Sequence, residues 1–132
     1  MRLCVGIDHL EIHRITKAME NPRFLSRYFG ARELEYFKRR RFSPATVAVS
    51  FCAKEAFAKA LGTGIRGFAL REVELLREDS GRPYLVFSGK AAGLIEKSGL
   101  RFEVSVSHDR RYALAQVIGY VEGEHHAGSN RR

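Results

Sequence analysis

The chain of 132 residues has the length of one domain, and 45% hydrophobic with 29% charged residues is the composition of a globular protein. The formal net charge of +8 indicates an anionic partner, such as nucleic acid, a phosphorylated ligand, an acidic membrane or an acidic protein. No stretch approaches the ~20 apolar residues of a membrane span. Gly6 and Asp8 interrupt the apolar N-terminal stretch, which is too short for a signal peptide, so we expect a cytoplasmic protein. We expect one domain over 1–122 and a disordered tail over 123–132.

Three elements are expected in the first third of the chain. Residues 2–7 form a short apolar strand that ends at Asp8, and apolar residues at helical spacing predict a helix over 11–20. A second helix is expected over 31–41, with inward-facing apolar residues at Leu34, Phe37 and Phe42. Its last residues, KRRR at 38–41, are either a solvated helix end or part of an anion-binding surface.

The segment SFCAKEAFAKALGTG, residues 50–64, belongs to a long apolar helix. Ser43 as the N-cap and Pro44 at the first helical position predict its start, and Gly62 predicts a left-handed cap after Leu61. This apolar helix nevertheless carries three charged residues, which are Lys54, Glu55 and Lys59.

The second half of the chain is predicted to form two hairpins joined by a helix. Strands are expected over 70–79, 84–89, 101–108 and 112–121, and a helix over 90–98 that Gly99 closes. Val73 and Leu75 face one side of the first of these strands and Glu72 and Glu74 the other, which predicts a half-buried strand. Because hairpins outnumber strand–helix–strand crossovers, we expect the α+β class.

Three charged residues are candidates for a single cation- and phosphate-binding site. Asp8 at a strand end could bind a hard cation, although a turn or helix-cap aspartate is the plainer interpretation. Glu55 and Lys59 are four residues apart and share one helix face, where they would ordinarily form a surface ion pair. Because the helix leaves little solvated surface, the two charges need partners, and a divalent cation with phosphate groups would supply them.

Two further motifs are weaker. Gly62-Thr63-Gly64 lacks the lysine of a phosphate-binding loop and is explained either as a helix cap or as backbone that approaches a phosphate. His108 at the end of a strand is either structural or functional, and nothing around it supports a nucleophilic triad. Cys4 and Cys52 lack metal-ligand spacing and are expected to be free thiols.

Four blocks of the sequence, in this order, resemble the holo-acyl-carrier-protein synthases, the small bacterial 4′-phosphopantetheinyl transferases. The blocks are GIDHLEIHRI, FCAKEAFAKALGTGI, GRPYL and VSVSHDRRYALAQVI, and they span Gly6 to Ile118. The resemblance implies a fold with helices packed on a small, mainly antiparallel sheet. It also implies transfer of the 4′-phosphopantetheine arm of coenzyme A to a serine of an apo-acyl carrier protein in fatty acid biosynthesis, with adenosine 3′,5′-bisphosphate as the other product.

The resemblance also implies roles for the candidate residues. Asp8 and Glu55 would hold a Mg²⁺ ion at the coenzyme pyrophosphate, and Lys59 would contact the phosphates. Gly62, Thr63 and Gly64 would line the coenzyme site, and His108 would lie near the coenzyme's phosphates on the opposite wall. Arg14 would belong to a basic surface that meets the acidic carrier protein, which agrees with ten Lys and Arg against five Asp and Glu in the first 41 residues.

The resemblance further implies a homotrimer with active sites at subunit interfaces, because relatives of this size assemble in that way. The chain departs from the family at Ser50, where many members carry a basic residue, and this leaves one expected phosphate contact without its side chain. Cys52 stands where alanine is common, and His9 and His13 are unusual in the first block, but none of these removes a proposed ligand.

Two other functions remain as alternatives. The net charge, the KRRR run and the aromatic residues would suit a small basic nucleic-acid-binding module, although no helix-turn-helix, zinc or RNA-binding motif is recognisable. A catalytically inactive relative that serves as a binding protein is the other alternative, but Asp8, Glu55 and Lys59 are all present.

Overall fold

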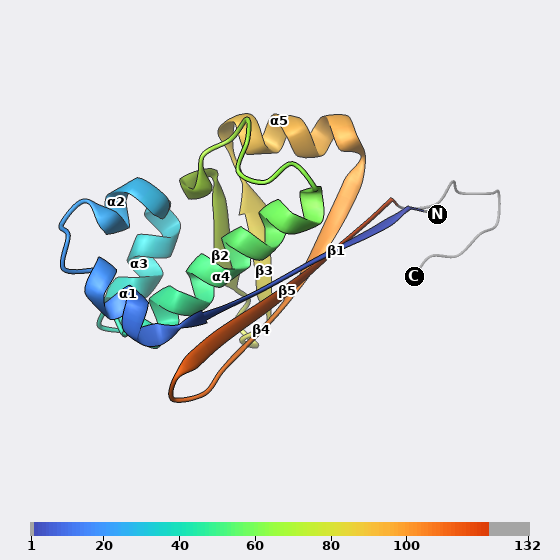
Figure 1. The fold of residues 1–132 in the computed structure, drawn as a ribbon. Helices are drawn as coiled ribbons and strands as arrows, with labels where there is room; N and C mark the ends of the chain where they lie inside the picture. Colours follow the sequence, from blue (N-terminus) through green and yellow to red (C-terminus); the bar gives the residue numbers. More distant parts are fainter. Residues whose placement is uncertain (1, 122–132) are drawn as a thin grey trace.

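The structure is a computed structural model that describes residues 2–121 (Figure 1). Its elements are β1 (Leu3–Glu11), α1 (Ile12–Ala18), α2 (Phe24–Tyr28), α3 (Ala31–Arg39), α4 (Pro44–Leu61), a short 3₁₀ helix (Leu70–Glu72), β2 (Val73–Arg77), β3 (Pro83–Phe87), α5 (Gly89–Ser98), β4 (Leu100–His108) and β5 (Tyr112–Val121). All strand pairs among the described residues are antiparallel, and helices pack beside them, so the expected α+β class is confirmed. The expected tail over 123–132 lies outside the described residues.

The sheet that positions the site has three antiparallel strands in the order β1-β5-β4. Its register places Asp8 opposite Ala115 and His108 opposite Ala113, so both candidate residues belong to the same sheet. β2 and β3 form a separate antiparallel hairpin. The helix α4 lies across the inner face of β1 and β5, as Figure 1 shows.

Small residues bring α4 very close to this sheet. The inward side chains of β5 are Ala113, Ala115 and Val117, and all three are fully buried. A Cβ atom at Gly6 would lie only 2.0 Å from the backbone oxygen of Ala56, so only glycine fits between β1 and the helix. The alternation of β5 and the alanines of α4 therefore set the distance between the strand that carries Asp8 and the helix that carries Glu55.

The predicted bounds of the central helix and its glycine cap agree with the structure, and Ser43 occupies the N-cap position, but its side chain makes no capping hydrogen bond. α4 begins at Pro44 and ends at Leu61, and Gly62 follows in the left-handed conformation with φ of +86°. Gly99 closes α5 in the same way, with φ of +70°.

Several details differ from the sequence-based expectation. β1 continues to Glu11 because it pairs with β5 along its whole length, and the short helix α2 was not predicted. Phe42 was expected to face inward, but it has φ of +53° and is 38% exposed, because the chain turns sharply between α3 and α4.

The prediction of a half-buried β2 is wrong, because both faces of this strand are covered. Glu74 is buried, and its Oε2 accepts a hydrogen bond of 2.9 Å from the backbone N–H of Glu33 in the first turn of α3. Glu74 therefore accepts a hydrogen bond from a backbone N–H group that has no partner within its own helix. The alternating pattern of the strand cannot reveal such a contact.

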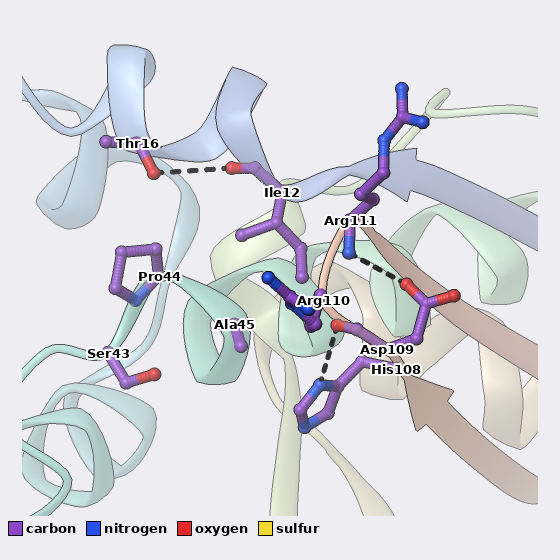
Figure 2. A pocket seen from close by; sticks show the side chains of 9 residues that line it. All are labelled: Ile12, Thr16, Ser43, Pro44, Ala45, His108, Asp109, Arg110 and Arg111. Atoms are coloured by element: carbon purple, nitrogen blue, oxygen red, sulfur yellow. Dashed lines mark hydrogen bonds between the residues drawn. The ribbon is translucent and has the colours of Figure 1, made fainter.

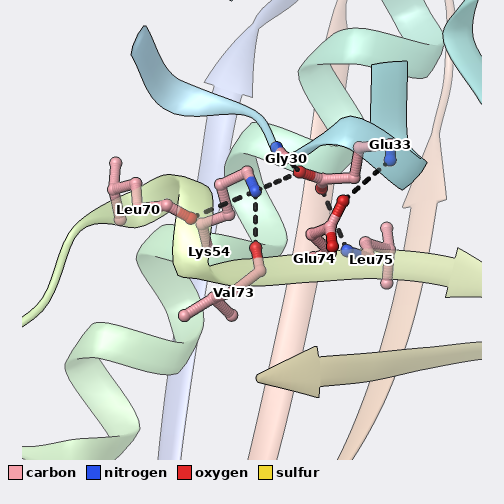
Figure 3. A network of polar contacts seen from close by, with 7 residues as sticks. All are labelled: Gly30, Glu33, Lys54, Leu70, Val73, Glu74 and Leu75. Carbon is pink, nitrogen blue, oxygen red and sulfur yellow. Dashed lines mark hydrogen bonds and ion pairs between the residues drawn. The ribbon is translucent and has the colours of Figure 1, made fainter. Parts of the chain in front are cut away.

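Lys54 is fully buried and anchors α4 to the rest of the fold (Figure 3). Its Nζ forms an ion pair with Glu33, donates to the carbonyl oxygens of Leu70 and Val73, and lies 5.0 Å from the centre of the Phe29 ring. Glu33 in turn accepts from the backbone N–H groups of Gly30 at 3.1 Å and Leu75 at 2.9 Å. This network satisfies the buried charge and points Lys54 away from Glu55.

Two other expectations concern the thiols and the membrane. Cys4 and Cys52 are both free, as predicted. Among the helices in residues 2–121, none is both long enough and apolar enough to cross a bilayer.

Candidate functional site

The candidate site lies where β1 runs beside the second half of α4. Asp8 projects from the inner side of β1, and Lys59 reaches back from α4 to meet it. The Lys59 Nζ donates to Asp8 Oδ1 at 2.9 Å and to the backbone oxygen of Ile7 at 3.2 Å. Glu55 lies one helical turn before Lys59 on the same face. The structure therefore brings Asp8, Glu55 and Lys59 together, although Asp8 and Lys59 are 51 positions apart in the sequence.

Burial and charge perturb the groups of this cluster. Burial raises the pKa of Glu55, the neighbouring Asp8 carboxylate raises it further, and Lys59 lowers it. The hydrogen bond to Asp8 and its charge raise the pKa of Lys59. Burial, and then the Asp8 and Glu55 charges, raise the pKa of Cys52 to about 12, so this thiol stays protonated. Two carboxylates thus repel each other beside a single lysine.

The donor set suits a hard divalent cation with an incomplete protein shell. Asp8 and Glu55 offer carboxylate oxygens, and a cation between them would relieve the repulsion that raises the pKa of Glu55. Within residues 2–121, no three His, Cys, Asp or Glu side chains are grouped in a way that would hold a metal. Mg²⁺ tolerates such a site because it usually takes one or two carboxylates and fills its octahedron with phosphate oxygens and water.

The glycine loop follows α4 directly at the end that carries Lys59. Residues 62–67 line a cavity of about 890 Å³. Gly62, Gly64 and Gly67 all have positive φ, between +66° and +86°, which residues with a Cβ rarely adopt. Thr63 Oγ1 donates to the backbone oxygen of Gly64 at 3.2 Å, and three of the six lining residues are glycines, which leave their backbone uncovered by side chains.

His108 lies at a different place, in a cavity of about 790 Å³ at the other end of α4 (Figure 2). The lining residues are Ile12, Thr16, Ser43, Pro44, Ala45, His108, Asp109, Arg110 and Arg111. The His108 Nδ1 lies 3.3 Å from the backbone oxygen of Asp109, and Asp109 Oδ1 accepts from the backbone N–H of Arg111 at 2.8 Å. This lining does not include Asp8, Glu55 or Lys59, so one chain does not bring the predicted coenzyme residues into a single pocket.

Sequence reasoning did not select Arg110 and Arg111, which stand beside His108 in this cavity. The signal was the pair of arginines that directly follows SHD in the turn between two strands, where side chains are free to face a ligand. Arg14, the predicted partner-binding residue, is exposed on α1.

Comparison with known proteins identifies the family. The sequence model of the 4′-phosphopantetheinyl transferase superfamily matches residues 4–117. The chain belongs to this superfamily. It is 43% identical over 115 residues to the holo-[acyl-carrier-protein] synthase of Clostridium botulinum (strain Alaska E43 / Type E3), covering 86% of this chain and 94% of the relative. It is 40% identical over 126 residues to the enzyme of the same name from Thermoanaerobacter sp. (strain X514), covering 94% and 91%.

Solved structures of phosphopantetheinyl transferases share the fold. The holo-[acyl-carrier-protein] synthase of Neisseria meningitidis matches with a TM-score of 0.84 at 30% identity, over 89% of this chain and 97% of that one. The holo-(acyl-carrier-protein) synthase of Bacillus anthracis str. Ames, in complex with CoA (3′,5′-ADP), matches with a TM-score of 0.76 at 31% identity, over 90% and 96%. These findings confirm the expected family, the fold and the transferase class of enzyme.

Proposed function

We propose that this protein transfers the 4′-phosphopantetheine group of coenzyme A to a serine of an apo-acyl carrier protein and releases adenosine 3′,5′-bisphosphate. The observation that carries the proposal is the meeting of Asp8, Glu55 and Lys59 on adjoining faces of β1 and α4. Two carboxylates and a lysine suit phosphoryl transfer, and they occur in a chain whose similar relatives are named holo-[acyl-carrier-protein] synthases.

Asp8 and Glu55 would hold Mg²⁺, which when bound supplies charge neutralisation for the coenzyme pyrophosphate. Lys59 is 55% exposed, so its ammonium group is free to exchange Asp8 for a phosphate oxygen when the coenzyme binds. The ion pair with Asp8 thereby keeps the lysine oriented before the substrate arrives.

Glu55 is the proposed proton acceptor, because its carboxylate lies beside Asp8 and Lys59, where the serine hydroxyl would arrive. The serine oxygen forms a bond to the phosphorus that bears the pantetheine arm, and the proton of the hydroxyl passes to a Glu55 carboxylate oxygen. The bond from that phosphorus to the bridging oxygen breaks, and the electron pair leaves with adenosine 3′,5′-bisphosphate. Lys59 stabilises the charge that develops on the phosphate oxygens.

The coenzyme would extend from this centre over the loop at residues 62–64, whose backbone is open to phosphate groups. The cavity at His108 carries Arg110 and Arg111 and has room for a nucleotide end, so we place the adenosine 3′-phosphate part of a coenzyme there. Since one chain keeps this cavity apart from Asp8 and Glu55, the complete site would join the cavity of one copy to the carboxylates of another.

The outer face of the three-stranded sheet supports such an assembly. Apolar side chains on this face are at least one-third exposed: Leu3, Val5, Ile7, Tyr112, Leu114 and Ile118. A contiguous apolar face of this kind on a small protein usually meets a partner. We propose that its partner is a second copy of the chain and that three copies close a ring, which makes a homotrimer with interfacial sites.

The carrier protein would dock on the basic side of α1 and α2. Arg14 and Lys17 are exposed on α1, and Arg23 and Arg27 stand at either end of the first turn of α2. Lys17, Arg23 and Arg27 also line a cavity of about 690 Å³ with Phe51, so a partner here would find cations around an apolar floor. Acidic carrier proteins suit this surface.

One incubation tests the proposed reaction. The full chain is mixed with coenzyme A, MgCl₂ and an apo-acyl carrier protein, and the intact mass of the carrier is measured over time. The carrier should gain one phosphopantetheine group, and a carrier with its acceptor serine changed to alanine should gain none. If several wild-type carriers keep the apo mass at high enzyme concentration, the proposed function is wrong.

A further inference from the structure

The loop at residues 62–67, which follows α4, is exposed along its whole length (Figure 1). Ala60 before the loop and Phe68 after it are both buried. The Phe68 ring makes an edge-to-face contact with Phe57, with ring centres 5.6 Å apart. The loop is therefore anchored in the core at both ends and uncovered between them.

Few interactions hold this loop in one conformation. Gly62, Gly64 and Gly67 have positive φ, and a Cβ atom at Gly62 or Gly64 would meet nothing within 4 Å. Within the described part of the chain, residues 63–67 make no hydrogen bond to another element, and the bond from Thr63 to Gly64 is internal to the loop. A segment with so few contacts rearranges at low cost, so the loop can move without disturbing the core.

Arg66 is the cation of this loop. The cavity of about 890 Å³ is lined by residues 62–67, and these six residues include one arginine and no carboxylate. Arg66 is exposed, and it makes no ion pair with any carboxylate in residues 2–121. Its guanidinium group is therefore accessible to an anion, and its planar fork suits phosphate oxygens.

A pyrophosphate at this place needs more than one cation. The loop begins at the C-terminal end of α4, where the helix dipole is negative and disfavours an anion. A divalent cation only balances the charges of Asp8 and Glu55, so of these site residues Lys59 alone offsets the two charges of a pyrophosphate diester. Because Lys59 also donates to Asp8, a further cation is favoured, and Arg66 is the lining residue that can supply it.

We propose that the loop at residues 62–67 closes onto the pyrophosphate group of the coenzyme and that Arg66 binds one of its oxygens as a second cation beside Lys59. The inference rests on the proposed function, because it takes the coenzyme to be bound at Lys59. Closure also gives Ile65, which is 47% exposed, a bound ligand to pack against.

Calorimetric titration of the full chain with coenzyme A, and separately with 3′-dephospho-coenzyme A, tests the contact at constant ionic strength with MgCl₂ present. Arg66→Gln should weaken the binding of both ligands about tenfold, because both contain the pyrophosphate. Arg66→Lys keeps the charge and should recover part of the affinity. Arg32→Gln, at an exposed position on α3, is the matched control and should bind as the wild type does. Both arginines are exposed, so the variants should fold normally.

Hydrogen exchange at the backbone amides of residues 63–67 measures the closure separately. Saturating coenzyme A with MgCl₂ should slow exchange at these amides in the wild type. In Arg66→Gln the slowing should be much smaller, even at a concentration that saturates the variant.

Four results would overturn the proposal. The first is equal affinity of the wild type and Arg66→Gln, or no binding of either ligand to the wild type. The second is a loss with coenzyme A that is absent with its dephospho form, which would place Arg66 at the 3′-phosphate. The third is a higher KM for carrier protein with unchanged coenzyme affinity, which would assign Arg66 to carrier docking. The fourth is unchanged exchange in the saturated wild type. Coenzyme binding and exchange need no turnover, so their failure is distinct from a failure of transfer, which the carrier mass reports.

Discussion

Among single residues, Gly6 determines how close the two candidate carboxylates, Asp8 and Glu55, come to each other. Its missing side chain lets β1 approach the backbone of α4 at Ala56, and Asp8 is two residues farther along the strand. Glu55 precedes Ala56 on the helix, so the two acids are brought together by backbone packing and held there against their own repulsion. Lys59 offsets part of that repulsion through its 2.9 Å hydrogen bond to Asp8.

Neutralising either carboxylate should abolish most of the activity. Asp8→Asn and Glu55→Gln should each lower kcat/KM for phosphopantetheine transfer by about 100-fold or more, because each removes one of two proposed cation ligands. The double variant should be little worse than either single variant, since the two groups act as a unit. Glu96→Gln, an exposed glutamate on α5, serves as the control. If each single change lowers kcat/KM only modestly and the loss in the double variant is the product of the two, Asp8 and Glu55 do not share a cation.

The raised pKa of Glu55 also predicts the stability of the metal-free protein against pH. A carboxyl group whose pKa is higher in the folded state stabilises the fold at low pH, and that contribution is lost as pH rises through the folded pKa. Glu55→Gln should therefore melt at a higher temperature than the wild type at neutral pH with a chelator present. The difference should vanish below the ordinary value of 4.5, where the wild-type carboxyl is protonated in both states. The melting temperatures of both proteins are measured from neutral pH to below 4.5. A Glu55→Gln variant that melts at a lower temperature than the wild type at neutral pH would contradict the expectation.

Of the elements, α4 does the most to organise the fold, because it is buried along most of its length and contacts the sheet through Lys59 and the α3–β2 region through Lys54. Its start at Pro44 and its end before Gly62 were predictable, since both depend on local signals in the sequence. The burial of Lys54 with Glu33 was not, because that contact joins residues 21 positions apart through tertiary packing. Glu74 was assigned to a solvated face for the same reason, since alternation alone does not reveal that a helix start lies over it.

Breaking this network should destabilise the whole domain. Lys54→Met should lower the free energy of unfolding by about 3–5 kcal/mol, because it leaves Glu33 buried without its cation. A Lys54→Met/Glu33→Gln double variant should lose less than the sum of the two single changes. Urea denaturation measures both, with Lys97→Met on the exposed side of α5 as the control. Strict additivity would show that Lys54 and Glu33 are not coupled.

In the whole molecule, α4 covers the inner face of the three-stranded sheet, and the outer face is exposed to solvent. Alternation along β4 correctly predicted that Phe102, Val104 and Val106 share one face, and this face packs against the core. The same pattern places apolar residues on the outer face, where a lone chain has nothing to cover them. The sequence named the candidate residues Asp8, Glu55, Lys59 and His108. It could not reveal that His108 lies in a cavity apart from the other three, because that separation depends on how the chain folds.

Disrupting the outer face should therefore separate the copies. Ile118→Asp places a charge at the middle of the apolar face and should convert the proposed trimer to monomers, with loss of most activity. Light scattering after size exclusion gives the mass, and Lys97→Asp on α5 is the matched surface control. A wild-type protein that is monomeric and fully active at assay concentration would contradict the proposed assembly.

The proposed complete site joins Asp8 and Glu55 of one copy to the His108 cavity of another, and subunit mixing distinguishes this arrangement from a site within one chain. Glu55→Gln is unfolded and refolded together with a His108→Glu/Arg110→Glu variant, and carrier modification is followed by intact mass. If each variant alone is inactive, an equal mixture should recover about one quarter of the wild-type activity, because that fraction of interfaces in randomly assembled trimers has both walls intact. A mixture that stays as inactive as its two components, while light scattering confirms mixed trimers, would contradict the shared site.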